Sequence, residues 1–430
     1  MKKVTSILES ALKDVSPSEN ELKAIKIRLE EFLNFLKKRI SALKISAEVF
    51  VGGSFAKETV IKKEKYDIDI FIRFDKKYNK NSLSDLTEKI LSHQNFTKVH
   101  GSRDYFRIFS SENTIFEIIP VRKIKTPKEA ENITDLSYFH VNYVKKKFKT
   151  KRVRDEVRLA KAFCYSNKCY GAESYIKGFS GYGLEILVYY YKSFLNFLKN
   201  ISKADSGKKI IIDVGKHYKN KNSVLMDLNA AKLDSPIILI DPTYKQRNLL
   251  AALSEEKFKK FQKACKNFLA NPRIDAFLIK KINFENLKEN ARRKKHEFVL
   301  LEAKTDKQEG DIAGSKLLKF YNNFSGEIKK YFEIKNQEFD YFGSKFANFF
   351  FSVKNRGEIT LKGPRLTDKE NSNKFRRKHK KVFEKKGRLY AKEKINFNLR
   401  DFLNKWKIKN KKHMKDMNIF ELKIKDYNCF

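Results

Sequence analysis

Cysteine, proline and long apolar runs are all scarce in this chain. It has four cysteines, Cys164, Cys169, Cys265 and Cys429. Cys164 and Cys169 could form half of a zinc site, but no second pair of Cys or His residues completes it, so we expect structural thiols in a reducing compartment. No uncharged apolar run approaches the roughly 18 residues of a membrane span. Glu9 and Asp14 interrupt the N-terminal segment, which is therefore not a signal peptide. These absences predict a soluble, cytoplasmic protein without a membrane partner.

Positive charge is present in large excess. The 430 residues carry 94 Lys and Arg against 52 Asp and Glu, a formal charge of +42. Such a charge points to a polyanionic partner, with nucleic acid as the first candidate, although a biased amino-acid composition is a competing contribution. Hydrophobic residues make up 41% and aromatics 13%, so most of the chain is expected to fold, in two to four domains.

The first 150 residues have the pattern of an α/β domain. A Ser-Pro-Ser-Glu cap predicts an amphipathic helix over 16–43. Alternating or apolar segments predict strands over 47–51, 66–74, 105–109 and 114–121. We therefore predict a mixed sheet with helices over residues 1–150.

The rest of the chain changes character twice. Residues 151–280 are mainly helical in pattern, apart from an extended segment at 237–242, and predict a central nucleotide- and RNA-binding domain. Residues 281–355 read as strand, helix and two aromatic-rich strands, the outline of a ferredoxin-like α+β unit. Residues 356–430 form a basic region: the stretch 351–416 contains about 23 Lys and Arg against about 7 Asp and Glu. The predicted fold class is thus α/β plus α+β, with several domains.

A glycine turn precedes a strand that carries paired acids. Gly52-Gly53-Ser54 ends one predicted strand, and Asp67 and Asp69 lie in the next. Residues i and i+2 of a strand point to the same face, so both carboxylates project together. Two adjacent carboxylates repel each other unless a cation lies between them, and Mg²⁺ prefers one or two carboxylates plus substrate phosphates. A glycine turn at a helix start suits a triphosphate, with the Ser54 hydroxyl beside it.

A third acid, Glu117, lies in an otherwise apolar strand. An acidic side chain there is costly without a partner. With Asp67 and Asp69 it predicts a site for two metals, about 3.5–4 Å apart, that would serve an in-line displacement at a nucleotide phosphate.

Longer segments around these residues resemble a known family. The run GGSFAKET…YDIDIFIRF is similar to the nucleotidyltransferase superfamily signature. The segments FEIIPV, YFH, EVRLAKAF, CYGAESYIKGFSGYGLEILVYYYKSF and IDPTYKQRNLLAALS add a resemblance to the archaeal-type (class I) CCA-adding enzymes. The resemblance covers most of the chain and is strongest over residues 50–255.

The resemblance implies roles for individual residues. Asp67, Asp69 and Glu117 match the metal ligands, although the family usually has Glu at the first position and Asp at the third. Ser54 and Lys57 match contacts of the triphosphate, with Lys57 standing where Arg is common. The resemblance implies that three residues hold the sugar and phosphates of the nucleotide, and that one reads the edges of C and A: His140, Lys161 and Tyr170 for the first role and Arg247 for the second.

The resemblance further implies a reaction and its partners. The expected activity is template-independent addition of CCA to the 3′ end of tRNA from CTP and ATP, with two Mg²⁺ ions. The basic C-terminal region would hold the acceptor stem and T arm, and a homodimer is also expected. Two other functions stay open at this point: a poly(A) or oligoadenylate polymerase, and a catalytically silent RNA-binding protein. Three retained acids argue against the silent protein.

Overall fold

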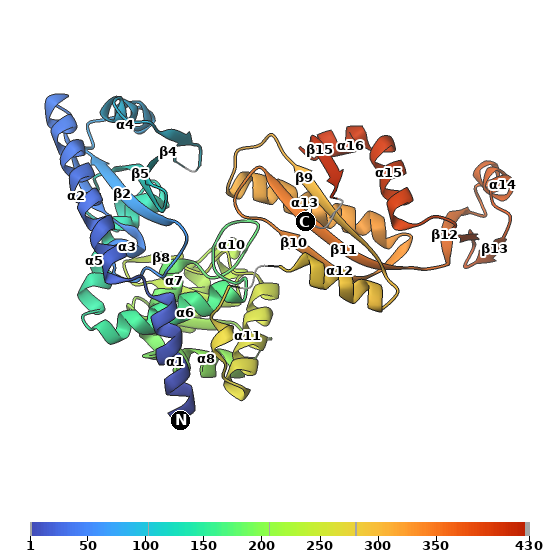
Figure 1. Ribbon diagram of the computed structural model, residues 1–430, viewed down its shortest axis with the longest axis horizontal. Coiled ribbons are helices and arrows are strands. Elements are labelled where there is room, and N and C mark those ends of the chain that lie inside the picture. Colours follow the sequence, from blue (N-terminus) through green and yellow to red (C-terminus); the bar gives the residue numbers. More distant parts are fainter. Residues whose placement is uncertain (1, 102, 206, 280–281, 426–430) are drawn as a thin grey trace. The chain divides into compact units, whose positions relative to one another are not determined.

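The computed structural model describes residues 2–101, 103–205, 207–279 and 282–425 (Figure 1). The chain divides into two compact units, Met1–Lys280 and Lys281–Phe430. The finer division into four domains remains a prediction. Within the described residues, no helix is both long and apolar enough to cross a membrane.

A five-stranded mixed sheet forms the first part of unit Met1–Lys280. The strand order is β1-β2-β5-β4-β3, and the bounds are β1 Ala47–Val51, β2 Tyr66–Phe74, β3 Thr97–Val99, β4 Tyr105–Ser111 and β5 Thr114–Arg122. β2 and β5 run parallel, and the other neighbours are antiparallel. The four predicted strands are therefore present. The edge strand β3 was not predicted, because three residues are too short to show alternation.

Helices cover one face of this sheet. They are α2 Glu19–Ala42 and α4 Leu83–Leu91, with the short 3₁₀ turn η1 Lys80–Ser82 before α4. The first helix, α1 Lys2–Val15, packs instead against the helical part of the unit, and the short α3 Gly53–Ala56 follows β1. The predicted helix over 16–43 begins later than expected, because Ser18 and not Ser16 makes the cap. The Ser18 hydroxyl accepts from the Glu21 N–H, and the Glu21 carboxylate accepts from the Ser18 N–H. α2 and α4 bury the even-numbered residues of β2, Ile68, Ile70 and Ile72.

The remainder of unit Met1–Lys280 is mainly helical. Its helices are α5 Ser137–Lys147, α6 Lys151–Ser166, α7 Gly181–Tyr191, α8 Phe194–Lys203, α9 Lys221–Asp227, α10 Ala230–Leu233 and α11 Glu255–Ala270. A small sheet, β6-β7-β8, is formed by β6 Ile210–Asp213, β7 Ile237–Asp241 and β8 Tyr244–Asn248. The short 3₁₀ turns are η2 Pro127–Glu129, η3 Ile133–Leu136 and η4 Ile274–Ala276. β7 confirms the extended segment predicted at 237–242.

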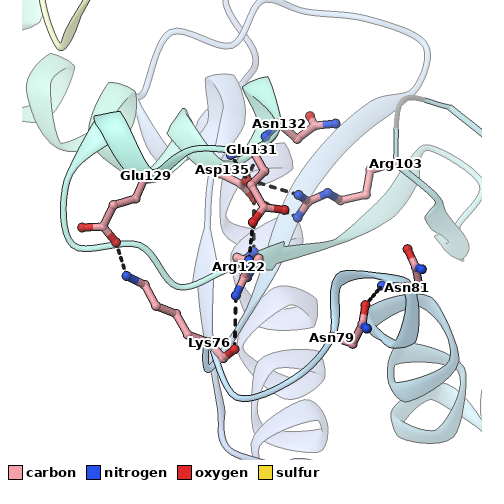
Figure 2. Close-up of polar contacts among 9 residues, drawn as sticks. All are labelled: Lys76, Asn79, Asn81, Arg103, Arg122, Glu129, Glu131, Asn132 and Asp135. Atoms are coloured by element: carbon pink, nitrogen blue, oxygen red, sulfur yellow. Dashed lines mark hydrogen bonds and ion pairs between the residues drawn. The ribbon is translucent and has the colours of Figure 1, made fainter.

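A buried carboxylate fixes the connection between the sheet and the helices. Asp135 accepts hydrogen bonds from the Arg103 guanidinium and from the backbone N–H of Arg122, Glu131 and Asn132 (Figure 2). The Arg122 side chain pairs with Glu131 and also donates to the Lys76 carbonyl. These contacts join the ends of β2 and β5 to η3, so α5 starts from a fixed position.

A βαββαβ arrangement, preceded by one helix, forms the main part of unit Lys281–Phe430. Its antiparallel sheet runs β10-β11-β9-β15, and the main elements are α12 Phe284–Arg293, β9 Glu297–Lys304, α13 Asp311–Lys329, β10 Phe332–Asp340, β11 Phe346–Asn355, α15 Leu399–Lys409, α16 Lys411–Asp416 and β15 Glu421–Ile424. The ferredoxin-like unit expected at 281–355 therefore extends to residue 424. Here the structure differs from the sequence prediction, which placed 356–430 in a separate basic region. A four-residue strand among lysines gives no periodic signal, but β15 pairs with β9.

The middle of the basic region is an insertion in this unit. It contains a three-stranded sheet, β12-β14-β13, and one helix: β12 Glu358–Arg365, α14 Lys369–Lys378, β13 Val382–Lys385 and β14 Arg388–Lys394. Its two ends lie side by side, since the Ile395 N–H donates to the Gly357 carbonyl and Asn355 donates to the Phe397 carbonyl.

Candidate active site

Three acids share the face of the large sheet that α2 and α4 leave uncovered. Asp67 and Asp69 lie on β2, and Glu117 lies directly opposite Asp69 on the parallel strand β5. The Asp67 carboxylate is 46% exposed. Burial, followed by the nearby charge of Glu117, raises the pKa of Asp69 to about 7. Two sequence positions about fifty residues apart thus lie opposite each other on neighbouring strands.

Two of the three acids, Glu117 and Asp67, lie beside basic side chains. Arg107 of β4 donates its Nε–H to Glu117 Oε1 over 2.8 Å, and Lys63 Nζ lies 3.9 Å from Asp67 Oδ2. In the part of the chain that the structure describes, no group of three or more His, Cys, Asp and Glu side chains lies together in a way that could hold a metal ion. Glu117 is turned toward Arg107, so the sequence-based alternative that it pairs with a basic side chain holds in this structure, with Arg in place of the expected Lys.

The donor set nevertheless fits a divalent cation at Asp69. Its carboxylate is removed from water beside the like charges of Glu117 and Asp67, and both raise its pKa. A cation relieves this repulsion, and hard divalent ions such as Mg²⁺ bind carboxylate oxygens. Asp67 and Asp69 are the acids that would hold such an ion, and Glu117 is paired with Arg107 in this structure.

The glycine turn touches Asp69 directly. The Gly52 N–H donates to the Asp69 carbonyl over 2.8 Å. Gly53 has φ +61°, and a Cβ atom there would lie 1.7 Å from Asp69 Oδ2, so only glycine allows this approach. Ser54 follows in α3, and its carbonyl accepts from the Thr59 N–H over 2.9 Å. The turn and the acids therefore form one site.

Both lysines predicted to contact phosphates meet on one buried acid. Glu185 of α7 accepts from Lys57 Nζ over 2.6 Å, from Lys161 Nζ over 2.8 Å and from the Thr59 hydroxyl over 2.7 Å. Burial would raise the pKa of Glu185, but Lys161 and Lys57 outweigh it and lower the value to about 2. Burial lowers the pKa of Lys161 to about 8 although Glu185 opposes this. These contacts join the loop after α3 to α6 and α7.

His140 and Arg247 meet on a second buried acid. Asp241 of β7 lies 2.8 Å from His140 Nε2 and 3.4 Å from Arg247 Nη1. The His140 ring stacks on Tyr182 with centroids 4.2 Å apart, and Lys57 Nζ lies 5.5 Å from the centroid of Tyr182. Burial lowers the pKa of His140 although Asp241 raises it. The two acid-centred groups are thus neighbours across Tyr182.

Tyr170 reaches the site through an aromatic pair. Its ring stacks on Tyr165 with centroids 4.2 Å apart, and Lys63 Nζ lies 5.4 Å from the centroid of Tyr165. A Cβ atom on Gly181 would lie 2.7 Å from the Tyr170 hydroxyl, so this hydroxyl abuts the first residue of α7. The structure therefore links Tyr170 to Asp67 through Tyr165 and Lys63.

Sequence reasoning missed the residues that organise this site. Glu185, Asp241, Arg107 and Tyr182 had no assigned role. A signal existed for Glu185, which stands alone in the apolar run GLEILV, because a buried acid needs partners. For Arg107 and Tyr182 no comparable signal is present in a chain so rich in basic and aromatic residues.

Comparison with known proteins identifies the family. The description "tRNA nucleotidyltransferase, second domain" matches residues 155–278, and "Second Messenger Oligonucleotide or Dinucleotide Synthetase domain" matches residues 1–138. The CCA-adding enzyme of Nanoarchaeum equitans is 36% identical over 350 residues, which cover 80% of this chain and 83% of that protein. The chain belongs to the family of CCA-adding enzymes.

Other comparisons agree with this family. The CCA-adding enzyme of Methanocaldococcus jannaschii is 29% identical over 414 residues, covering 90% of this chain and 87% of the relative. Among solved structures, a cytoplasmic RNA terminal U-transferase superposes with a TM-score of 0.51 at 14% identity, covering 66% of this chain and all of that one. The Cid1 poly(U) polymerase gives 0.50 at 14% identity, covering 63% and 96%. These two likenesses concern the fold alone.

Proposed function

We propose that this protein adds CCA to the 3′ end of tRNA from CTP and ATP, with two Mg²⁺ ions. The observation that carries the proposal is the meeting of Asp67, Asp69 and Glu117 on one sheet face, against a glycine turn and a buried pair of lysines. Because the chain belongs to the family of CCA-adding enzymes, we propose tRNA as its RNA substrate. Nucleotide substrates and a divalent metal are general to nucleotidyltransferases.

The chemistry is transfer of a nucleotidyl group. The oxygen of the RNA 3′-hydroxyl forms a bond to the α-phosphorus, the bond to the pyrophosphate oxygen breaks, and pyrophosphate leaves. The metal ions, when bound, supply positive charge that lowers the pKa of the attacking hydroxyl and stabilises the leaving oxygen. Asp67 and Asp69 would hold them, and Glu117 would complete the set after exchanging Arg107 for a cation.

Side chains around the acids would bind the nucleotide. Ser54 and Lys57 follow the glycine turn and would bind the triphosphate, together with Lys161 and Tyr170. His140 would contact the sugar, and its hydrogen bond to Asp241 fixes the orientation of the ring. Arg247 is anchored at one terminal nitrogen by Asp241, which leaves other guanidinium donors for base edges.

The basic insertion of the second unit would bind the tRNA. Arg376, Arg377 and Lys378 are exposed at the end of α14, and Lys380 and Lys381 follow. Proteins recognise A-form helices mainly through backbone and 2′-hydroxyl contacts, for which a lysine-rich surface is adequate. We propose that this surface grips the acceptor stem and T arm.

Labelled nucleotides test the proposal. The full chain is incubated with radiolabelled CTP or ATP and with tRNA that lacks CCA, CA or A. We expect addition of C, C and A only as far as each transcript requires, and then arrest. Long A tails with ATP alone would indicate a poly(A) polymerase instead. Absence of any incorporation would leave an RNA-binding protein and refute the proposed function.

A further inference from the structure

Glu185 is an ionised side chain at a position where a buried charge is costly. It is 0% exposed, and its neighbours on α7, Leu184 and Ile186, belong to the apolar core. Moving a carboxylate out of water costs several kcal/mol, and a well-packed apolar replacement of a buried ion pair is often neutral or stabilising. Stability alone therefore gives a weak reason for keeping Glu185 with two lysines around it.

The buried group carries an unbalanced charge. Lys57 and Lys161 contribute two positive charges and Glu185 one negative charge, so the group has a net charge of about +1 when all three are ionised. Thr59 adds hydrogen bonds but no charge. A net positive charge that is removed from water favours an anion nearby. The anion supplied by the proposed reaction is the triphosphate.

The two lysines differ in how many N–H donors remain for a ligand. An ammonium has three N–H donors, and Lys161 Nζ uses them on the Glu185 carboxylate, the Thr59 hydroxyl and the Thr59 carbonyl. Lys57 Nζ donates to Glu185, and the Tyr182 ring lies 5.5 Å away. Lys57 is the C-cap residue of α3, the helix whose first residue, Gly53, abuts Asp69. Glu185 thus determines where the Lys57 ammonium is held relative to Asp69.

We propose that Glu185 is a positioning residue for the nucleotide: it holds Lys57 and Lys161 so that their positive charge meets the phosphates of the incoming triphosphate. This inference rests on the proposed function and adds a residue to it. Without the carboxylate, the Lys161 ammonium is buried without a counter-ion, and Lys57 loses its anchor. The first effect disfavours the positive charge of Lys161 near the phosphates, and the second leaves the Lys57 donors without a fixed orientation.

The competing explanation is an ion pair that only ties α6 and α7 to the loop after α3. The two explanations differ for ligands that lack the β- and γ-phosphates. If the ion pair has only a structural role, loss of the Glu185 carboxylate weakens the binding of CTP and CMP alike, because both bind the same folded site. If Glu185 positions the lysines, its loss weakens the binding of CTP much more than that of CMP.

The experiment measures dissociation constants of CTP and CMP for the full chain carrying Glu185→Gln, by calorimetry without RNA and well below the unfolding temperature. We expect CTP to bind about tenfold or more weakly, the scale of a lost hydrogen bond to a charged group. CMP should change by less than about twofold. In the labelled-nucleotide assay, kcat/KM for CTP should fall by a similar factor.

Glu156→Gln is the matched control. The Glu156 carboxylate of α6 accepts from the Phe194 N–H over 2.8 Å, so it also ties helices together, but it lies outside the proposed site. This variant should lower the unfolding temperature and keep the wild-type ratio of CTP to CMP affinity. Glu185→Asp keeps the charge and serves where Glu185→Gln does not fold; it should retain more of the CTP preference than any neutral substitution.

Two results would overturn the inference. An unchanged ratio of CTP to CMP affinity in a folded Glu185→Gln protein would show that Glu185 has only a structural role. Tighter CTP binding would mean that the carboxylate merely reduces the positive charge of the pocket. The proposed function is tested separately: a wild-type protein that does not extend tRNA, yet loses CTP preference with Glu185→Gln, would refute CCA addition and keep the role of Glu185 in triphosphate binding.

Discussion

The two compact units of this protein place their charges in opposite ways. Among the described residues of the first unit, the buried Asp, Glu, Lys, Arg and His residues are Arg73, Asp135, His140, Lys161, Glu185 and Asp241. In the described part of the second unit, no Asp, Glu, Lys, Arg or His residue is buried, and the buried Ser and Thr residues are Thr305, Ser325, Ser352 and Ser372. The second unit therefore carries its charge on its surface, as exposed lysines and arginines.

Charged side chains therefore have different roles in the two units. A buried, paired charge keeps a fixed orientation and acts strongly over short distances, which suits chemistry at a phosphate. An exposed cation is screened by salt and adjusts to its partner, which suits attraction of a long polyanion. The following variants test whether the two units divide the function in this way.

The largest effect is expected from Asp69→Ala. Nucleotide addition should fall by about 1000-fold or more, because the carboxylate at the centre of the acid face is lost. Folding and tRNA affinity should stay near wild type, since the substitution removes a charge that burial disfavours. The control is Asp75→Ala, just beyond the end of β2, which should retain activity. Near-normal turnover of Asp69→Ala at saturating Mg²⁺ would contradict the metal role.

Neutralising the basic insertion should have the next largest effect. Replacement of Arg376, Arg377, Lys378, Lys380 and Lys381 by Gln should weaken tRNA binding on the order of 100-fold and flatten its salt dependence. Each lost phosphate contact reduces the slope of log K against log salt by just under one unit. The maximal rate at saturating tRNA should change much less.

A second basic run provides the matched control for this variant. Five exposed lysines of the first unit are replaced in the same way: Lys145, Lys146, Lys147, Lys149 and Lys151. The same loss of charge there should reduce tRNA affinity less. Equal losses in both variants would show that net charge, and not the insertion, attracts the RNA.

The stability of the first unit should fall at acidic pH, because its buried Glu185 must be ionised. The pKa of Glu185 is about 2 in the folded chain against 4.5 as its ordinary value. A lowered pKa of an acid stabilises the fold above the ordinary value, and this contribution is lost as the pH falls from about 4.5 through about 2. The contribution is on the order of 3 kcal/mol, about a hundredfold in the folding equilibrium. Thermal unfolding of wild type should therefore depend more on pH between 5 and 2 than that of Glu185→Gln.

The smallest effect is expected from Arg247→Ala. Discrimination of C and A against U and G should fall about tenfold, because a guanidinium that offers several donors to base edges is removed. Affinity for tRNA should not change. Lys245→Ala, two residues earlier on β8 and exposed, is the control and should leave selection intact. Unaltered rejection of UTP and GTP by Arg247→Ala would remove this residue from base reading.

The sequence predicted what depends on short-range pattern. The acids of β2 followed from strand alternation, and Glu117 followed from its cost in an apolar strand. The partners of these residues could not be predicted, because Glu185 and Lys57 are 128 positions apart and meet only through the packing of α7 on the loop after α3. The ion pair of Arg107 with Glu117 depends in the same way on strand order, which places β4 beside β5.

In the second unit, too, the sequence predicted elements with a local pattern but not those that depend on tertiary pairing. The pattern of β9, α13 and β11 was readable from alternation and helical periodicity. The strand β15 was hidden, since its four residues gain their strand conformation from pairing with β9. Local propensity decides long elements, and tertiary pairing decides short ones.

The adjoining ends of the basic insertion have a consequence for protein engineering. Gly357 and Ile395 are joined by a backbone hydrogen bond, so the chain enters and leaves the insertion at one point of the fold. A short turn between these positions should close the chain with little strain, because the entropy of closing a loop changes slowly with its length. The insertion is thus an exchangeable part, and basic modules of other sizes could be grafted there without altering the sheet β10-β11-β9-β15.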